Sequence, residues 1–321
     1  MRKSILTLVI LLCAVSMLAA DAPKAFKLTD PRGDDLGNGE LIYPSDTSLQ
    51  RGDLDLVEFG ARPVDGGTMF YAIFARPVRT PGPEPIDDVG TALNKVARKG
   101  FYTTNLDIYI DTDRIEGSGS TTTLPGRNIS IDPKSAWEKI ICLTPDPSQA
   151  RVLLQRIMLR EANARADEPA TEPSKEEVKA QRKELKDEMR VNVDEFVFFP
   201  DRISVRGSKI EFFVPASFLG GAASDKWSYV VAVSGADMIE RFDQGQRVVG
   251  PGDLIDTLMI LPVRNGRPRY MFGTDRERRV EFLPPVVDLL LPAGADQKAI
   301  LSNFGPESMP VVPGVVPADV K

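Results

Sequence analysis

The sequence contains no histidine. Without an imidazole, the chain cannot form a Ser-His or Cys-His nucleophile pair, a zinc site with histidine ligands, or a histidine-ligated haem or copper site. Carboxylates remain available, because Asp and Glu together number 46. A glycosidase needs two of them at a set separation in space, which spacing along the chain does not reveal. Composition alone therefore leaves carboxylate chemistry open.

Cysteine is also scarce, with two residues in the whole chain. Cys13 lies in an N-terminal apolar segment, and its removal with that segment leaves Cys142 without an internal disulfide partner. A chain of 321 residues can bury about three quarters of its unfolded surface. We therefore expect burial to hold this exported fold together, with metal binding as a supplement.

Long apolar runs and excess positive charge are missing too. The apolar residues 5–12 follow Arg2 and Lys3 and precede small residues at 19–20, a pattern typical of a secretory signal peptide. No later segment reaches the roughly 18 apolar residues that a membrane span needs. Because 46 Asp+Glu outnumber 40 Lys+Arg, nucleic acid is not an expected partner. We predict a signal peptide over residues 1–20, a periplasmic or extracellular location, and no transmembrane segment.

Short segments of β-type sequence separated by turn residues dominate the rest of the chain. Residues 53–62 and 69–76 flank Asp65-Gly66-Gly67, which is typical of a β-hairpin. About ten such segments at short spacing predict a β-sandwich rather than a parallel sheet. The other predicted strands include residues 106–111, 135–144, 191–199, 202–205, 209–214, 227–233, 254–261 and 286–291.

One of these strands runs directly into an acidic loop. Residues 106–111 alternate apolar and polar side chains, as a half-buried strand requires. Asp111, Asp113, Glu116 and Ser118 then place oxygen donors around Gly117 and Gly119. Calcium takes about six to eight oxygen ligands, so these residues, Asp111 and Asp113 above all, are candidate metal ligands, although the spacing departs from the EF-hand loop. The alternative is a pair of solvated turn residues.

A second oxygen-rich loop lies near the N-terminus, within residues 28–44. Its candidate ligands are Asp30, Asp34, Asp35 and Asn38, placed among glycines. The alternative is a polar loop in which Asx side chains and glycines form tight turns. We expect the two acidic loops to converge at one edge of the sandwich and to form one structural calcium site.

Residues 146–189 differ in kind from the segments around them. Asp146-Pro147 and an apolar stripe predict a helix to about residue 165. Ser174 with Glu177 forms a capping box that opens a second, charged helix. The segment is therefore predicted to be a helical hairpin inserted between strands. It is either a packed or solvated excursion or an arm that binds a protein partner.

Six segments carry a likeness to a known family. They are LTDPRGDDLGNGELIYP (28–44), GDLDLVEF (52–59), LDIYIDTDRIEGSGSTTTLPGRN (106–128), AWEK (136–139), VPASFLG (214–220) and PPVVDLLLPAGADQKAILSNF (284–304). Together they resemble the C-terminal domain of glucodextranase, a sandwich module also appended to amylopullulanase-type enzymes. That module is related to the DOMON-like and family-nine carbohydrate-binding modules.

The resemblance implies an all-β fold, an antiparallel jelly-roll-like β-sandwich with an inserted helical hairpin. The sandwich would span residues 21–305, with a proline-rich tail over 306–321. The resemblance also implies carbohydrate binding without hydrolysis, and it supports an ion role for both acidic loops. Candidate sugar platforms are Trp137, Trp227, Tyr270 and Phe272, because an aromatic ring packs on the apolar face of a pyranose. The chain has only two tryptophans, which weakens the stacking argument.

Three functions therefore compete. The first is a secreted, non-catalytic module that binds a polysaccharide or cell-surface glycan and is stabilised by calcium. The alternative is a cell-envelope scaffold or assembly protein whose helical insertion binds a protein partner. Haem or redox binding, as in some DOMON-like domains, has the least support, because ligation would have to rely on Met or Cys142.

Overall fold

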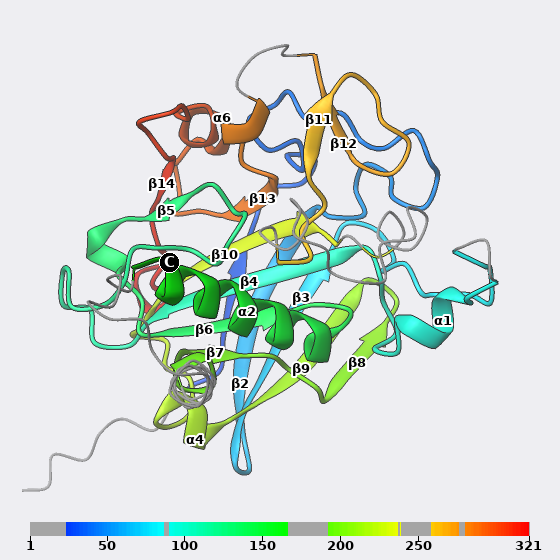
Figure 1. Cartoon of the computed structure of the whole chain (residues 1–321). Helices are drawn as coiled ribbons and strands as arrows, with labels where there is room; N and C mark the ends of the chain where they lie inside the picture. Colours follow the sequence, from blue (N-terminus) through cyan, green and yellow to red (C-terminus); the bar gives the residue numbers. More distant parts are fainter. Residues whose placement is uncertain are drawn as a thin grey trace, which may run out of the picture.

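Two five-stranded sheets form the body of the protein. The computed structural model describes residues 24–86, 90–165, 192–236, 238, 258–275 and 280–320. The first sheet has the order β1 (Phe26–Thr29), β2 (Leu56–Val64), β3 (Gly67–Phe74), β9 (Lys209–Pro215), β8 (Ile203–Arg206). The second has the order β13 (Val286–Leu290), β10 (Ser228–Gly235), β4 (Thr104–Asp111), β6 (Lys139–Leu143), β7 (Val197–Phe198). The predicted all-β sandwich is confirmed (Figure 1).

Shorter elements connect and flank the sheets. Two additional two-stranded ladders pair β11 with β12 and β14 with β5. Of the helices, α2 is long and the others have one or two turns. These elements are α1 (Leu93–Val96), β5 (Ser130–Ile131), η1 (Pro133–Ser135), α2 (Pro147–Arg165), α4 (Ala216–Leu219), β11 (Val263–Asn265), β12 (Phe272–Thr274), η3 (Val280–Phe282), α6 (Gln297–Leu301), β14 (Val311–Val312) and η4 (Pro317–Asp319).

Glycine turns build the two hairpins of the first sheet. Between β2 and β3, Gly66 has φ +79°, and between β8 and β9, Gly207 has φ +60°. Tight hairpin turns need this left-handed backbone, which glycine adopts without the steric cost of a Cβ atom. Both hairpins occur where the sequence predicts them. In this part of the fold, the turn residues alone were sufficient to predict the hairpins.

The space between the two sheets is filled by a continuous apolar core. Phe59, Phe70 and Phe212 form a stack across β2, β3 and β9, with successive ring centroids 6.0 and 5.8 Å apart. From the second sheet, Ile108 and Val231 point into the same core. Each buried aromatic ring removes a large apolar area from water, so this core supplies the main stabilisation of the sandwich.

The outer face of the second sheet is also covered. Helix α2 lies across this sheet in Figure 1 and buries Leu153, Leu154 and Ile157 in a second apolar cluster. Every residue of β4 is therefore buried. The prediction of a half-buried strand over residues 106–111 is wrong. The alternating sequence identified the apolar face as buried, but helix α2 also covers the face that carries the polar side chains.

A buried ion pair sits on this covered face. Arg127 and Asp107 have side chains that are only 1% and 2% exposed, and their Nε and Oδ2 atoms are 2.6 Å apart. A second contact joins Arg127 Nη2 to Asp107 Oδ1 at 3.1 Å. Because the two charges pair with each other, the Asp107 carboxylate can be tolerated on this covered face.

The helical insertion is described only in its first half. Helix α2 confirms the predicted helix that begins at residue 147, whereas the predicted second helix at 174–189 lies outside the described residues. The strand predicted at 191–199 is wrong over 192–196, which are helical, and is reduced to the two residues of β7. Of the strand predicted at 254–261, the described residues 258–261 contain only a single bridge at Ile260.

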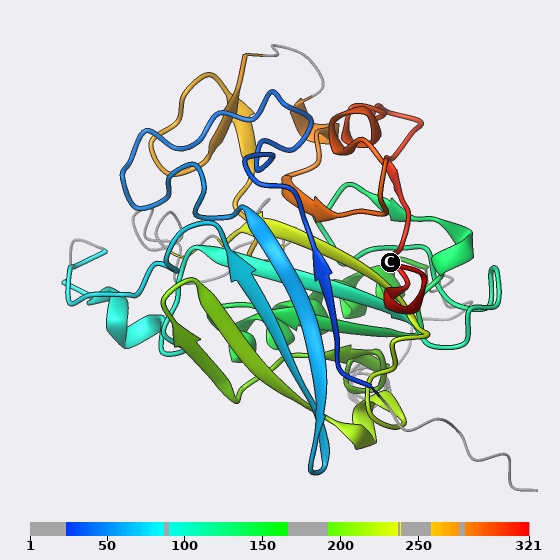
Figure 2. The ribbon, with the colours of Figure 1, turned by 180° about the vertical axis from the view of Figure 1, so that it is seen from behind.

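The C-terminal segment packs against the sandwich. Strand β14 pairs with β5, and Val315 forms a bridge with Tyr229 of β10. Val312 and Val315 are both buried. Figure 2 shows this segment, in red, beside the body of the protein. The proline-rich residues expected as a tail are therefore part of the packed unit. The predicted signal peptide lies outside the described residues, and among those described no helix is long and apolar enough to cross a membrane.

Candidate metal and ligand-binding sites

Three carboxylates from distant parts of the chain meet where the two sheets come together. Asp30 follows β1, Asp34 lies in the next loop, and Asp288 is in the middle of β13. One ligand oxygen from each lies within 4.8 Å of the others. We call Asp30, Asp34 and Asp288 the first carboxylate centre. Sequence reasoning found the first two residues and missed Asp288, which stands in an otherwise apolar strand.

A fourth carboxylate faces this centre. Asp55 lies directly before β2 and is 3% exposed. Its Oδ2 accepts a hydrogen bond from the Gly33 amide at 2.7 Å, whereas its Oδ1 is buried and has no hydrogen-bond partner. Asp30 Oδ2 and Asp34 Oδ1 are buried without a partner as well. A buried oxygen without a donor costs free energy, so three of them together suit binding of a cation.

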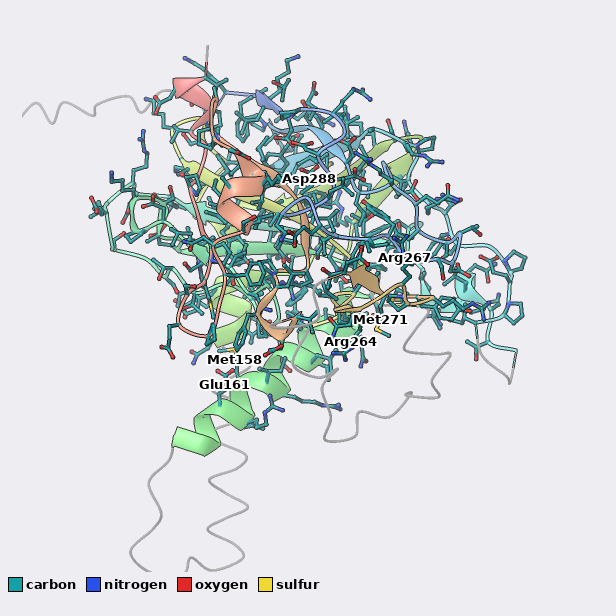
Figure 3. All side chains as sticks on the ribbon, turned by 90° about the horizontal axis from the view of Figure 1, so that it is seen from above. Met158, Glu161, Arg264, Arg267, Met271 and Asp288 are labelled. Carbon is teal, nitrogen blue, oxygen red and sulfur yellow. The ribbon has the colours of Figure 1, made fainter. Side chains whose placement is uncertain are left out.

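The pKa shifts at the first carboxylate centre also favour binding of a cation. Burial, followed by the charge of Asp34, raises the pKa of Asp30 to about 8. Burial and then the charge of Asp30 raise the pKa of Asp288 well above its usual range. Among the described residues, no Lys or Arg nitrogen lies within 4.0 Å of these carboxylates or of Asp55. In Figure 3, Arg264 and Arg267 lie well away from Asp288.

The other two predicted ligands of this loop have local partners instead. Asp35 Oδ2 accepts hydrogen bonds from the Tyr43 hydroxyl at 2.5 Å and the Gly52 amide at 2.6 Å. Asn38 Oδ1 accepts one from the Glu40 amide at 3.2 Å. Of the four oxygen-bearing residues predicted in this loop, Asp30 and Asp34 are thus the ones that the fold brings together with Asp288.

The second acidic loop forms a separate group. Asp111, Asp113 and Glu138 each place one carboxylate oxygen within 4.8 Å of the others. We call these three residues the second carboxylate centre. Glu138 lies directly before β6, beside the end of β4, and nothing in its sequence pattern marked it as a ligand. Asp111 is 1% exposed, and its Oδ2 is buried without a partner.

The expectation that the two loops converge at one edge is wrong. Strand β10 pairs Ser228 with Asp111, and it pairs Val233 with Asp288. The two centres are therefore offset by five residues along β10. At about 3.3 Å per strand residue, this offset is roughly 17 Å. One calcium ion cannot bridge them, so each centre has to be judged by itself.

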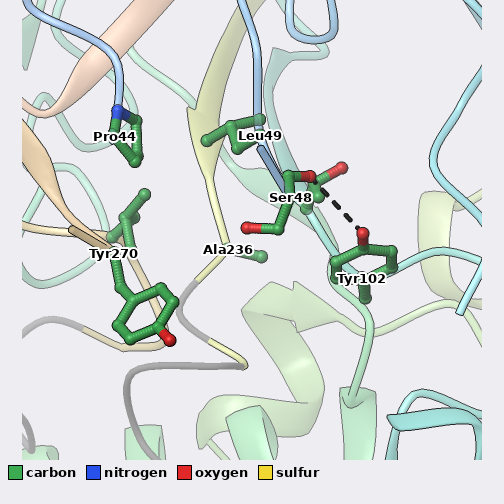
Figure 4. A pocket seen from close by; sticks show the side chains of 8 residues that line it. Pro44, Ser48, Leu49, Tyr102, Ala236 and Tyr270 are labelled. Carbon is green, nitrogen blue, oxygen red and sulfur yellow. Dashed lines mark hydrogen bonds between the residues drawn. The ribbon is translucent and has the colours of Figure 1, made fainter. Parts of the chain in front are cut away.

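The four aromatic candidates differ in accessibility. Phe272 is 0% exposed and makes a T-shaped contact with Tyr43 at 5.3 Å, so its ring cannot receive a sugar. Tyr270 is half-buried and lines a small pocket with Leu49, Tyr102 and other residues (Figure 4). In this pocket the Tyr102 hydroxyl donates to the Ser48 carbonyl at 3.4 Å.

The two tryptophans lie near the second carboxylate centre. Trp137 directly precedes Glu138, and its indole Nε1 donates to the Thr122 carbonyl at 2.9 Å. Trp227 directly precedes Ser228, the residue that pairs with Asp111. Trp137 packs on the outer apolar cluster and Trp227 on the core between the sheets, so they lie on opposite faces of the second sheet. Both are half-buried.

A comparison with protein-family models matches residues 25–313 to the SLH-like C-terminal binding module of glucodextranase. The chain belongs to this family. The match covers both sheets and both carboxylate centres, which confirms the resemblance seen in the sequence. No curated protein matches the chain. As a glucodextranase-type module, the chain belongs to a family of binding modules rather than of catalytic domains.

Within this glucodextranase-type module, the arrangement of carboxylates suits cations. Hard oxygen donors without hydrogen bonds fit calcium, which binds carboxylate and carbonyl oxygens. At the first centre, Asp30, Asp34 and Asp288 would hold such an ion, with the Asp55 carboxylate as a charged neighbour. At the second centre, the ligands would be Asp111, Asp113 and Glu138.

Proposed function

We propose that this chain is an exported, non-catalytic carbohydrate-binding module with a structural calcium ion at the first carboxylate centre. Membership of the glucodextranase C-terminal module family supports the binding function. The three buried carboxylate oxygens without donors support the ion. The apolar N-terminal residues 5–12 and the family together support a periplasmic or extracellular location.

The calcium proposal rests on how the first centre is built. Asp288 comes from the second sheet, whereas Asp30 and Asp55 adjoin strands of the first. A divalent ion among them would neutralise carboxylates that otherwise repel each other in a partly buried site. It would also link the two sheets at that point. An ion bound only by the native state stabilises it by mass action.

The glycan would meet the half-exposed aromatic side chains. Trp137, Trp227 and Tyr270 are half-buried, whereas Phe272 is fully buried. Aromatic rings contribute to sugar binding because their faces match the apolar face of a pyranose. Trp137 and Trp227 lie on opposite faces of the second sheet, and Tyr270 lies near the other end of β4, so the three are separate candidate contact areas.

The scaffold alternative has less support. Its proposed arm is the helical insertion, but α2 buries Ala150, Leu153, Leu154 and Ile157 against the second sheet. Those residues are then not available to a partner. The insertion is better explained, over its described half, as the cover of the sheet's outer face.

Affinity electrophoresis tests the glycan function directly. The full chain should be retarded in gels that contain a polysaccharide it binds, from a panel of dextran, pullulan and cell-wall polysaccharides. Trp137→Ala and Trp227→Ala should be compared with Trp→Phe at the same positions, which keeps an aromatic ring. Unretarded migration of the folded protein across the whole panel contradicts the proposed function.

A further inference from the structure

The second carboxylate centre differs from the first in its access to solvent. Asp111 is buried at the end of β4, Glu138 is half-buried, and Asp113 is exposed. The three carboxylates therefore form a gradient from the interior to the surface. An ion held here would be buried on its Asp111 side and open on its Asp113 side.

At the buried end of this centre, one carboxylate oxygen of Asp111 has no hydrogen-bond donor. Asp111 Oδ1 accepts hydrogen bonds from the amides of Arg114 at 2.6 Å and Asp113 at 3.2 Å. Its Oδ2 has neither a donor nor solvent. The side chain of the neighbouring Arg114 does not pair with the Asp111 carboxylate, because its Nη2 pairs with Asp319 Oδ2 at 3.6 Å. In the described part of the chain, no Lys or Arg nitrogen lies within 4.0 Å of the three carboxylates.

The open end is held in shape by hydroxyl and amide groups. The Ser118 hydroxyl lies 3.0 Å from Asp113 Oδ1 and 3.3 Å from Glu138 Oε1, and so joins the two carboxylates. The Thr112 amide donates to Glu138 Oε2 at 2.7 Å. A Cβ atom at Gly119 would come within 2.6 Å of Glu138 Oε1, so glycine allows the loop to close on this side chain.

We infer that Asp111, Asp113 and Glu138 hold a second calcium ion with open coordination, and that this ion binds vicinal hydroxyls of the glycan. Calcium takes about six to eight oxygen ligands, so three carboxylates leave several positions for water. Exchangeable water on an exposed ion can be replaced by two adjacent sugar hydroxyls. The sugar part of this inference rests on the proposed function, whereas the ion and its hydration do not.

Terbium tests the ion without any glycan. Terbium replaces calcium in oxygen sites, and its luminescence lifetimes in H2O and D2O report the number of coordinated waters. The full chain should show a hydrated population with about three or more waters. Asp113→Asn should lose that population, because an amide oxygen still accepts the bonds to Ile115 and Ser118 but carries no charge. Asp34→Asn, at the first centre, should retain it.

Glycan binding is then measured by affinity electrophoresis on dextran and pullulan, with calcium or with EGTA. We expect EGTA, Asp113→Asn and Glu138→Gln each to weaken retardation about tenfold or more, and Asp65→Asn, an exposed carboxylate in the β2–β3 turn, to leave it unchanged. Circular dichroism establishes that each variant is folded.

The outcomes separate the two proposals. Retardation that is equal in calcium, in EGTA and in Asp113→Asn keeps the proposed function and overturns the present inference. The absence of a hydrated terbium population in the wild-type chain also overturns the inference. Failure of the wild-type chain to bind any glycan overturns the proposed function together with the sugar part, and a hydrated terbium population in that case upholds the ion alone.

Discussion

Asp288 of β13 accepts a hydrogen bond from the backbone amide of Leu56 in β2, with an N–O distance of 2.7 Å. This contact joins the two sheets directly, because β2 belongs to the first and β13 to the second. The same carboxylate faces Asp30 and Asp34. The position that joins the sheets is therefore also the position where negative charge is concentrated.

Removal of calcium should destabilise the protein. A ligand present at about 100 times its Kd stabilises the native state by about 2.7 kcal/mol. We expect EGTA to lower the melting temperature of the wild-type chain in differential scanning calorimetry. Asp34→Asn should show a much smaller response to EGTA, whereas Asp65→Asn, an exposed carboxylate in the β2–β3 turn, should respond like the wild type. Identical melting curves with and without EGTA contradict a structural ion.

The metal-free protein should lose stability as the pH rises from about 4 to about 8. Burial and the charge of Asp34 raise the pKa of Asp30 to about 8, whereas an Asp in an unfolded chain titrates near about 3.9. Between these values the unfolded state releases a proton that the folded state keeps, so the free energy of unfolding decreases with pH. Urea denaturation in EGTA across this range measures the slope, and Asp30→Asn should reduce it. A free energy of unfolding that rises over the same interval would count against this assignment.

Breaking the buried ion pair should be costly, and removing it whole should not be. Arg127→Met leaves the Asp107 carboxylate buried without its counter-ion, which costs about 3–5 kcal/mol. The double variant Arg127→Met, Asp107→Leu should recover most of that loss, because no unpaired charge remains. Urea denaturation of the single and double variants gives the comparison. If the single and double variants were equally stable, the unpaired Asp107 carboxylate would not be the cause of the destabilisation.

Neighbouring valines in β14 should respond differently to the same change. Val312 is buried and Val311 is exposed. Val312→Ala should reduce the free energy of unfolding by about 2 kcal/mol, through lost burial and a residual cavity. Val311→Ala should change it by less than about 0.5 kcal/mol. If both substitutions are neutral in thermal denaturation, the C-terminal segment does not stabilise the sandwich.

Local patterns in the sequence predicted those parts of the fold that depend on neighbours along the chain. The hairpin turns at Gly66 and Gly207 and the helix that begins at Pro147 follow from turn and cap chemistry. The predictions of strand boundaries and burial were wrong where packing against distant segments determines the structure. The segment at 192–196 is helical, and β4 is covered on both faces because α2 lies across its sheet.

For the candidate sites, the sequence by itself determined that two loops carry closely spaced carboxylates and that histidine chemistry is excluded. Only the tertiary structure decided which carboxylates meet. Asp288 and Glu138 join their centres through strand pairing and sheet packing, which bring together residues far apart in the chain. The register of β10 also separates the two loops that the sequence suggested as one site. Such non-local geometry leaves no periodic signal in the residues themselves, so spacing along the chain could identify candidate ligands but not assemble them.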